Sequence, residues 1–257
     1  MSTDTLLNSF GEKNKEDVRS CLLKLLPHVN INNLILCGGL AVRYHLRRSN
    51  KTFDYGREFN DLDFLLKDVG DLKSSICKDL IVYHYHDYTN KKKEHADDFF
   101  VALVDRSSKV KLDIFSYVPY TPFDVEEVEF ENVKIKIRNP EDQLATQILE
   151  SAVVLEGGTI NPKWIENIEM LLTISDSDKA NKYFHSKHYY NGREENPFTE
   201  NVLDVYERIK NKIKVNPEVL ATKSTKRTPY KCELCENKNG FTVSPMENVY
   251  KVLGYTE

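Results

Sequence analysis

The sequence lacks the features of membrane-spanning, secreted and disulfide-rich proteins. Its longest apolar stretches, such as residues 34–37 and 168–174, fall far short of the roughly 20 residues that a helix needs to cross a bilayer. The first ten residues contain Asp4 and no basic start followed by an apolar run, so we read no secretory signal there. Five cysteines are an odd count for a disulfide framework. We therefore expect a soluble, cytoplasmic protein.

The chain also lacks an excess of positive charge. Its 40 acidic side chains outnumber the 36 basic ones, so the field of the whole protein does not favour a polyanion over the entire surface. Any binding of nucleic acid must therefore be local. What is present is a composition of 40% hydrophobic and 30% charged residues over 257 positions, which is typical of a folded globular protein.

The pattern of apolar residues changes from strand-like to helical along the chain. We expect an α/β (α+β) protein with a mixed sheet over residues 1–138, a helical domain over 139–215 and a C-terminal extension with a small ribbon over 216–257. The expected strands are 33–37, 62–66, 80–88, 99–104, 109–117 and a hairpin over 125–137. The expected helices are 15–26, 40–48, 141–155, 162–174, 199–213 and 245–252.

Two glycines stand between the first expected strand and the helix that follows it. Gly38 and Gly39 leave this turn without side chains, so a phosphate group could approach the amide N–H groups at the start of the helix. A strand-to-helix turn also needs glycine for its own backbone angles. The glycine pair alone is therefore weak evidence for a phosphate site.

Three aspartates on two expected strands supply the stronger signal. Asp61 and Asp63 are two residues apart and point to the same face of their strand, although a strand has no structural need for paired like charges. Asp113 is the only acid in a second strand-like run and can lie beside them. Three carboxylates can hold two magnesium ions through hard oxygen ligands, as phosphoryl-transfer chemistry requires.

Each aspartate also has an interpretation without chemistry. Asp61 could cap a turn, Asp63 could be solvated on an edge strand, and Asp113 could pair with Lys109 or Lys111. For a single aspartate we favour that interpretation. For the ordered set that follows the glycine turn we favour a metal site.

Three segments resemble the nucleotidyltransferase superfamily related to DNA polymerase beta. They are Cys-Gly-Gly-Leu-Ala-Val at 37–42, Asn-Asp-Leu-Asp-Phe at 60–64 and Lys-Leu-Asp-Ile-Phe at 111–115. The chain is most similar to the abortive-infection-type nucleotidyltransferase toxins, because Asn-Pro-Glu-Asp-Gln-Leu-Ala at 139–145 and Pro-Lys at 162–163 each open a helix. The resemblance implies roles by position. It places Gly38 and Gly39 near the nucleotide phosphates, makes Asp61 and Asp63 metal ligands, and makes Asp113 a ligand that also activates the acceptor hydroxyl.

The resemblance covers roughly residues 30 to 175 and has two departures. The stretch between the glycine turn and the aspartate pair is longer than in compact members. Gln147 stands where the toxin-like members often carry a helical lysine, which leaves open which cation contacts the phosphates. Lys163 or Arg57 could replace that lysine, although each also fits a solvated surface charge.

The C-terminal part contains half of a zinc-site pattern. Cys232 and Cys235 have zinc-finger spacing, but a closed structural site needs four ligands. His185 and His188 could complete a Zn²⁺ clip. The alternative is two reduced cysteines in a hairpin and two histidines in a polar loop.

Two further groups of residues each have a chemical and a simpler interpretation. His84 and His86, with the lysines at 91–93, could meet phosphate, but a solvated hairpin tip is the simpler interpretation. A cluster of aromatic residues near His185 could stack on a nucleobase, although packing between helices is the safer interpretation; its members are Tyr183, Phe184, Tyr189 and Tyr190, with Arg193 beside them.

The sequence therefore predicts a Mg²⁺-dependent enzyme that moves a nucleoside monophosphate from a nucleoside triphosphate, such as ATP, to an acceptor hydroxyl. The acceptor could be a tRNA, a protein side chain or a small molecule, and the protein could be a toxin of a toxin–antitoxin or phage-defence system or an antibiotic nucleotidyltransferase. The competing hypothesis is a non-catalytic module that binds a nucleotide or a partner. The choice of acceptor lies in pocket walls that the sequence does not reveal.

Overall fold

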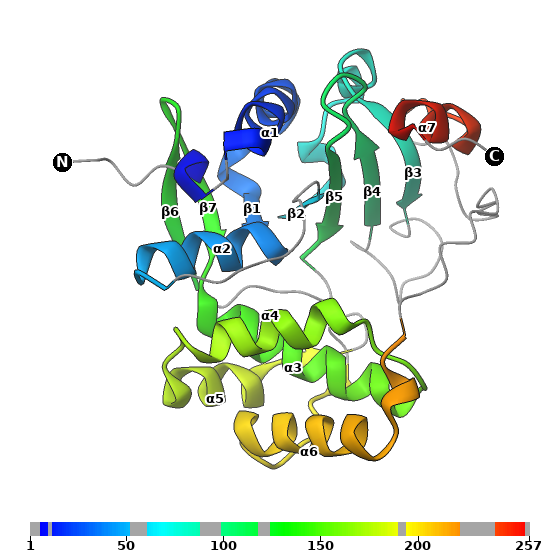
Figure 1. The fold of residues 1–257 in the computed structure, drawn as a ribbon. Coiled ribbons are helices and arrows are strands. Elements are labelled where there is room, and N and C mark those ends of the chain that lie inside the picture. The colour runs from blue at the N-terminus through cyan, green and yellow to red at the C-terminus, as the bar shows by residue number, and fades with distance from the viewer. Residues whose placement is uncertain are drawn as a thin grey trace.

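The fold is built around one seven-stranded sheet (Figure 1). The computed structural model describes residues 6–9, 12–51, 61–87, 99–117, 124–189, 194–221 and 240–254. Its strand order is β3-β4-β5-β2-β1-β7-β6. The strands are β1 (Leu34–Cys37), β2 (Asp61–Leu66), β3 (Ile81–Asp87), β4 (Phe99–Val104), β5 (Lys111–Ser116), β6 (Val125–Phe130) and β7 (Val133–Arg138).

The sheet is mixed, as the sequence predicts. β2 runs parallel to β5 and β1 runs parallel to β7, whereas β1–β2, β3–β4, β4–β5 and the β6–β7 hairpin are antiparallel. The α/β class and the order of a sheet followed by helices are confirmed. β2 lies in the middle of the sheet, so the interpretation of Asp63 as a solvated residue on an edge strand is wrong.

Alternation of side chains gives the central strands two different faces. In β2, Leu62, Phe64 and Leu66 are buried in the main hydrophobic core, and their neighbours Asp61 and Asp63 are only partly buried. Helix α1 (Glu12–Leu25) covers the core face with four buried side chains: Val18, Cys21, Leu22 and Leu25. The polar positions of β2 and β5 are therefore left on the opposite face.

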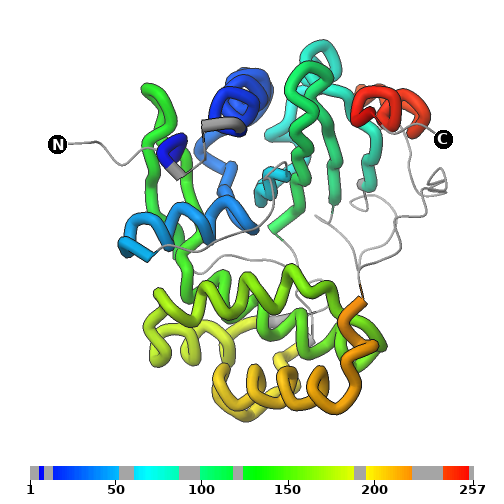
Figure 2. The backbone as a smooth tube through the Cα atoms, in the orientation of Figure 1, coloured from blue at the N-terminus to red at the C-terminus, as the bar shows by residue number. Residues whose placement is uncertain are grey.

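Helix α2 (Gly38–Arg48) follows β1 directly and links the sheet to a second hydrophobic core. Its Leu40, Ala41 and Tyr44 pack in the core of the sheet, whereas Val42 and Leu46 belong to the core of the helices that follow. Those helices are α3 (Pro140–Glu156), α4 (Pro162–Leu172), α5 (Ser177–Ser186) and α6 (Val202–Val215), and they form a separate layer next to the sheet (Figures 1 and 2).

The helix starts have clear local causes. Asn139 and Asn161 each accept a hydrogen bond from a backbone N–H two residues later, and a proline occupies the first turn of both α3 and α4. Helix α5 is not predicted from the sequence, because only Ala180 and Phe184 are buried in its otherwise polar segment. Its N-cap, Asp176, accepts a hydrogen bond from the backbone N–H of Lys179.

The last described helix returns to the sheet. Helix α7 (Met246–Leu253) places Val249 against Ile81 of β3 and Val104 of β4. Just before it, Phe241 is fully buried, with its ring 5.0 Å from that of Tyr85. The part of the predicted ribbon at 230–239 lies outside the described residues, and the predicted boundaries between domains stay a prediction. Within the described ranges, no helix has the length and apolar character that crossing a membrane requires.

Candidate active site

The two parallel strands β2 and β5 place two carboxylates side by side. Asp63 and Asp113 are register partners, and Asp61 is paired in the same way with Lys111. The side chains at 61, 63, 111 and 113 therefore share one face of the sheet, opposite the main core. The structure thus places Asp113 next to Asp63, although the two residues are 50 positions apart in the sequence.

The glycine bend closes onto the same carboxylates. Cys37, the last residue of β1, is the register partner of Asp63, so helix α2 begins beside that aspartate. Gly38 has φ of +65°, and a Cβ atom at this position would lie 2.0 Å from Asp63 Oδ2. Only glycine fits this position, for both its backbone angle and its contact with Asp63. The backbone N–H of Gly39 donates a hydrogen bond to the Asp63 carboxylate.

Burial and the neighbouring charges raise the pKa of both Asp63 and Asp113. Burial is the main cause that raises the pKa of Asp63 to about 6, and Asp61 adds to the rise, while Lys163 and the Gly39 hydrogen bond oppose it. Burial followed by the charges of Asp63 and Asp61 raises the pKa of Asp113 to about 7. Both carboxylates therefore bind protons more tightly than an exposed aspartate does.

Two lysines face Asp61. Lys163 Nζ from α4 lies 3.6 Å from Asp61 Oδ2, and Lys111 Nζ lies 3.9 Å from Asp61 Oδ1. Lys163 is thus brought to the carboxylates from a helix that starts about 100 residues later in the sequence. Asp61 Oδ1 is buried and has no hydrogen-bond partner among the described residues. Lys111 offsets the charge of this oxygen without a hydrogen bond, so the oxygen keeps the capacity to bind a ligand.

The chemistry of these groups fits a divalent cation. Within the ranges that the structure describes, no three His, Cys, Asp or Glu side chains are gathered closely enough to form a ready metal site. Asp61 nevertheless offers an unsatisfied oxygen, and Asp63 and Asp113 offer carboxylates whose negative forms lack sufficient compensation. Carboxylate oxygens are the ligands that Mg²⁺ prefers. A bound cation would give the Asp61 oxygen a partner and would compensate the negative charge of Asp63 and Asp113.

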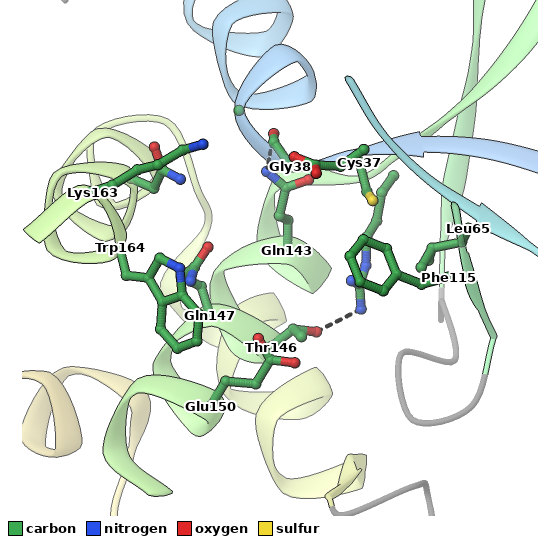
Figure 3. A pocket seen from close by; sticks show the side chains of 14 residues that line it. Cys37, Gly38, Leu65, Phe115, Gln143, Thr146, Gln147, Glu150, Lys163 and Trp164 are labelled. Carbon is green, nitrogen blue, oxygen red and sulfur yellow. Dashed lines mark hydrogen bonds between the residues drawn. The ribbon is translucent and has the colours of Figure 1, made fainter. Parts of the chain in front are cut away.

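A cavity of about 210 Å³ extends from the glycine bend to helices α3 and α4. Asp63 lines it, as do Gly38 and Gly39. Figure 3 shows Trp164, Gln147 and Glu150 on one side and Leu65 and Phe115 on the other. The cavity is smaller than the roughly 300–1,000 Å³ of pockets that enclose whole ligands. It can therefore hold one part of a larger molecule whose remainder lies outside.

Buried charges fix the first turn of α3, and two members of this network, Arg138 and Thr146, also line the cavity. Arg138 Nε donates to Asp142 Oδ2 at 2.6 Å, and Lys187 Nζ donates to the other oxygen of Asp142. Arg138 also donates to Thr146 Oγ1, and its backbone carbonyl lies 2.9 Å from His45 Nε2 of α2. Burial lowers the pKa of Lys187 to about 8, with Arg138 contributing and Asp142 opposing. This network joins β7, α2, α3 and the end of α5.

Several predicted site residues cannot be placed. Arg57, Cys232 and Cys235 lie outside the described residues, as does the side chain of His188. His185 is exposed at the end of α5. The zinc clip is therefore untested.

The histidine pair and the aromatic group are placed in part. The rings of His84 and His86 lie 4.2 Å apart, and the lysines at 91–93 fall outside the described residues. Burial, followed by the charge of His86, lowers the pKa of His84 to about 4. Phe184 is fully buried and stacks on Phe198 at 6.2 Å, so for this ring the interpretation as packing between helices is confirmed.

Sequence reasoning did not identify most of the cavity wall. Gln143 and Glu150 share one face of α3 with Gln147, and Asn167 shares one face of α4 with Lys163; of these five residues the sequence analysis names only Gln147 and Lys163. This polar face within otherwise apolar helices is a signal that could have been found. Which face of α3 or α4 turns toward the sheet depends on how the helices pack, and the sequence alone does not show this packing.

Comparison with known proteins finds similarity in structure only. No family model matches the sequence, and no curated protein matches it. An antigenic nucleotidyltransferase-like protein from Paracoccidioides brasiliensis is 14% identical, with a TM-score of 0.39, over 85% of this chain and 92% of that one.

Two other solved structures are similar to the chain at this level. The antibiotic-resistance factor ANT(2'')-Ia is 14% identical, with a TM-score of 0.42, over 66% of this chain and 89% of that one. JHP933 from Helicobacter pylori is 12% identical, with a TM-score of 0.30, over 80% of this chain and 92% of that one. Similarity at this level assigns no activity.

Proposed function

We propose that the protein is a Mg²⁺-dependent nucleotidyltransferase. The observation that carries this proposal is the pairing of Asp63 with Asp113 across β2 and β5, directly beside a bend that only glycine can form. A nucleoside triphosphate would place its phosphates at Gly38 and Gly39, beside the carboxylates. Its nucleoside would enter the cavity between the bend and helices α3 and α4.

Asp61, Asp63 and Asp113 would hold the metal. When bound, Mg²⁺ neutralises charge on the phosphate oxygens and stabilises the charge that develops as phosphorus is attacked. Asp113 lies on the β5 side of Asp63, so the two carboxylates are held next to each other by the pairing of their strands. The protein thereby contributes mainly position and electrostatic complementarity.

Asp113 is the group best suited to take the proton of the acceptor hydroxyl. It lies on β5 directly beside Asp63, and a carboxylate held next to the metal-binding pair can accept a proton from a hydroxyl that approaches the phosphates. In the proposed reaction the acceptor oxygen bonds to the α-phosphorus and the bond to the bridging oxygen breaks. Pyrophosphate leaves, and the acceptor's proton passes to an Asp113 carboxylate oxygen.

Lys163 provides the positive charge that Gln147 does not. Its ammonium group is close to Asp61 and acts on the pKa values of both Asp63 and Asp113. When a triphosphate binds, this flexible side chain can turn from the carboxylate to a phosphate oxygen. Arg57 is the other candidate named from the sequence, and its position is not described.

A non-catalytic nucleotide-binding module is the competing function. The absence of a ready three-ligand metal cluster among the described residues favours it. Calorimetry with nucleoside triphosphates separates the two. An enzyme of the proposed kind binds the nucleotide more tightly with Mg²⁺ than without it, and Asp63→Asn removes that difference. Equal affinity with and without the metal would support the module.

The acceptor can be identified by label transfer. We would incubate the purified protein with each α-labelled triphosphate and with tRNA, total protein or a panel of aminoglycosides and lincosamides. The fraction that takes the label names the acceptor class and decides between an RNA- or protein-modifying enzyme and an antibiotic nucleotidyltransferase. A toxin role predicts that expression slows growth and that Asp63→Ala relieves the effect. Equal harm from the variant would remove the toxin role.

A further inference from the structure

One buried polar atom in the cavity wall is left without a partner. Gln143 is 4% exposed, and its amide nitrogen Nε2 donates to the backbone carbonyl of Gly38 at 3.0 Å. That bond fixes the orientation of the amide, because the carbonyl of Gly38 can only accept. The other end of the amide, Oε1, has no hydrogen-bond partner among the described residues.

The unpaired oxygen calls for a hydrogen-bond donor. A buried acceptor without a partner costs roughly 1–3 kcal/mol, so a ligand that supplies a donor gains by binding there. Gln143 belongs to the cavity lining and contacts the glycine bend. It therefore stands at the end of the cavity that would receive the phosphates.

The position along α3 selects the part of the nucleotide that meets Gln143. Glu150 also lines the cavity, seven residues further along α3, or about 10 Å of helix. Trp164 lines the cavity on the same side as Gln147 and Glu150 (Figure 3). A nucleotide whose phosphates lie at the bend would thus carry its sugar past Gln143 and its base toward Trp164.

Resting on the proposed function, we infer that Gln143 Oε1 accepts a hydrogen bond from a hydroxyl group of the nucleotide's sugar. Ionised triphosphate oxygens only accept hydrogen bonds, so the nearest donors of the nucleotide itself are the 2′- and 3′-hydroxyls of the ribose. Gln143 is then a residue that determines specificity for the sugar. Its contact with Gly38 couples that recognition to the bend beside Asp63.

The test compares sugars rather than activity. We would measure the affinity of the wild-type protein for the four ribonucleoside triphosphates and for their 2′-deoxy and 3′-deoxy forms, with Mg²⁺, by calorimetry and by quenching of Trp164. This residue is the only tryptophan and lines the cavity. Loss of one hydroxyl should weaken binding about 5- to 20-fold, the effect of one hydrogen bond. The deoxy analogue that binds more weakly identifies the hydroxyl that Gln143 recognises.

A matched pair of variants assigns the effect to Gln143. Gln143→Met keeps the length of the side chain and should bring the ribose and deoxyribose forms to within about 2-fold of each other. Glu207→Met, at an exposed position of α6 outside the cavity lining, should leave the wild-type preference in place. A thermal unfolding profile checks that each variant is folded.

The outcomes are distinguishable. If both deoxy forms bind the wild type as tightly as the ribose form, or if Gln143→Met keeps the preference, the inference is wrong while the proposed function stands. If no triphosphate binds the wild type, with or without Mg²⁺, the proposed function fails and this inference fails with it.

Discussion

Asp63 and Asp113 are register partners on parallel neighbouring strands, so two carboxylates lie beside each other on a half-buried face of the sheet. Strand packing alone gives no reason for this arrangement, since directly opposed like charges destabilise a sheet. The pKa of each carboxyl group is raised, mainly by burial. The free protein therefore carries an electrostatic cost that a cation at this face would remove.

The first prediction concerns stability and pH. An aspartate titrates near 3.9 in the unfolded chain, whereas the folded pKa values are about 6 and about 7, so the folded protein holds more protons between about pH 4 and 7. Without added metal, this contribution to stability is fully present below about pH 4 and is lost as the pH rises to 7. Asp113→Asn should reduce that slope. Urea unfolding at several pH values measures it, and an unchanged slope in the variant would contradict the electrostatic account.

The second prediction concerns the glycine bend. Gly38→Ala would force a Cβ atom against Asp63 Oδ2 and would hold a non-glycine residue at positive φ. We expect a loss of about 1–3 kcal/mol in stability, together with displacement of Asp63 and loss of Mg²⁺-dependent nucleotide binding. Gly157→Ala is the control, because φ there is −80° and the added Cβ has only an ordinary contact. Chemical denaturation and calorimetry should show the contrast, and equal effects of the two substitutions would refute this role of the bend.

The sequence predicts the carboxylates better than it predicts the cavity. Asp61 and Asp63 are recognisable because two acids on one face of an apolar strand have no structural cause. Asp113 is recognisable because it is the only acid in a second apolar strand. The order of strands that places Asp113 beside Asp63 depends on pairing between distant segments, and one sequence does not encode it visibly. The sequence does not identify Gln143 and Glu150, because a polar residue on a buried helix looks the same in the sequence whether it packs inside the protein or contacts a ligand.

Secondary structure is likewise predicted where the local sequence determines it and not where packing does. β4 has the predicted bounds, Phe99–Val104, because apolar β-branched and aromatic residues are bounded by polar segments. Helix α5 was missed because only two of its side chains are buried, so the core of the other helices specifies it more than its own periodicity does.

The third prediction separates Lys163 from the other surface lysines. Lys163→Met removes the cation nearest Asp61, and we expect label transfer to fall about 10²-fold while the unfolding midpoint changes little. Lys210→Met is the control, since Lys210 lies on helix α6, where it pairs with the exposed Glu207 and its ammonium group lies 5.4 Å from the centre of the Tyr206 ring. Kinetics of both variants under the same conditions measure the difference. Full activity of Lys163→Met would exclude this lysine from the site.

The fourth prediction concerns the network of buried charges that holds the first turn of α3. Asp142 is fully buried between Arg138 and Lys187, so Asp142→Ala leaves two buried cations without their carboxylate. We expect a loss of about 3–5 kcal/mol in the free energy of unfolding. Glu127→Ala breaks an exposed pair with Lys134 and should cost less than about 1 kcal/mol. Similar losses for the two variants would show that the network does not anchor α3.

The central claim is that this site transfers a nucleoside monophosphate, and the position of the label tests it most directly. The protein would be given the same triphosphate labelled either at the α- or at the γ-phosphate, with Mg²⁺ and each acceptor class. The account predicts that the acceptor takes only the α-label, that the γ-label leaves as pyrophosphate, and that Asp63→Asn abolishes both. Transfer of the γ-label, or no transfer of the α-label to any acceptor, would contradict it.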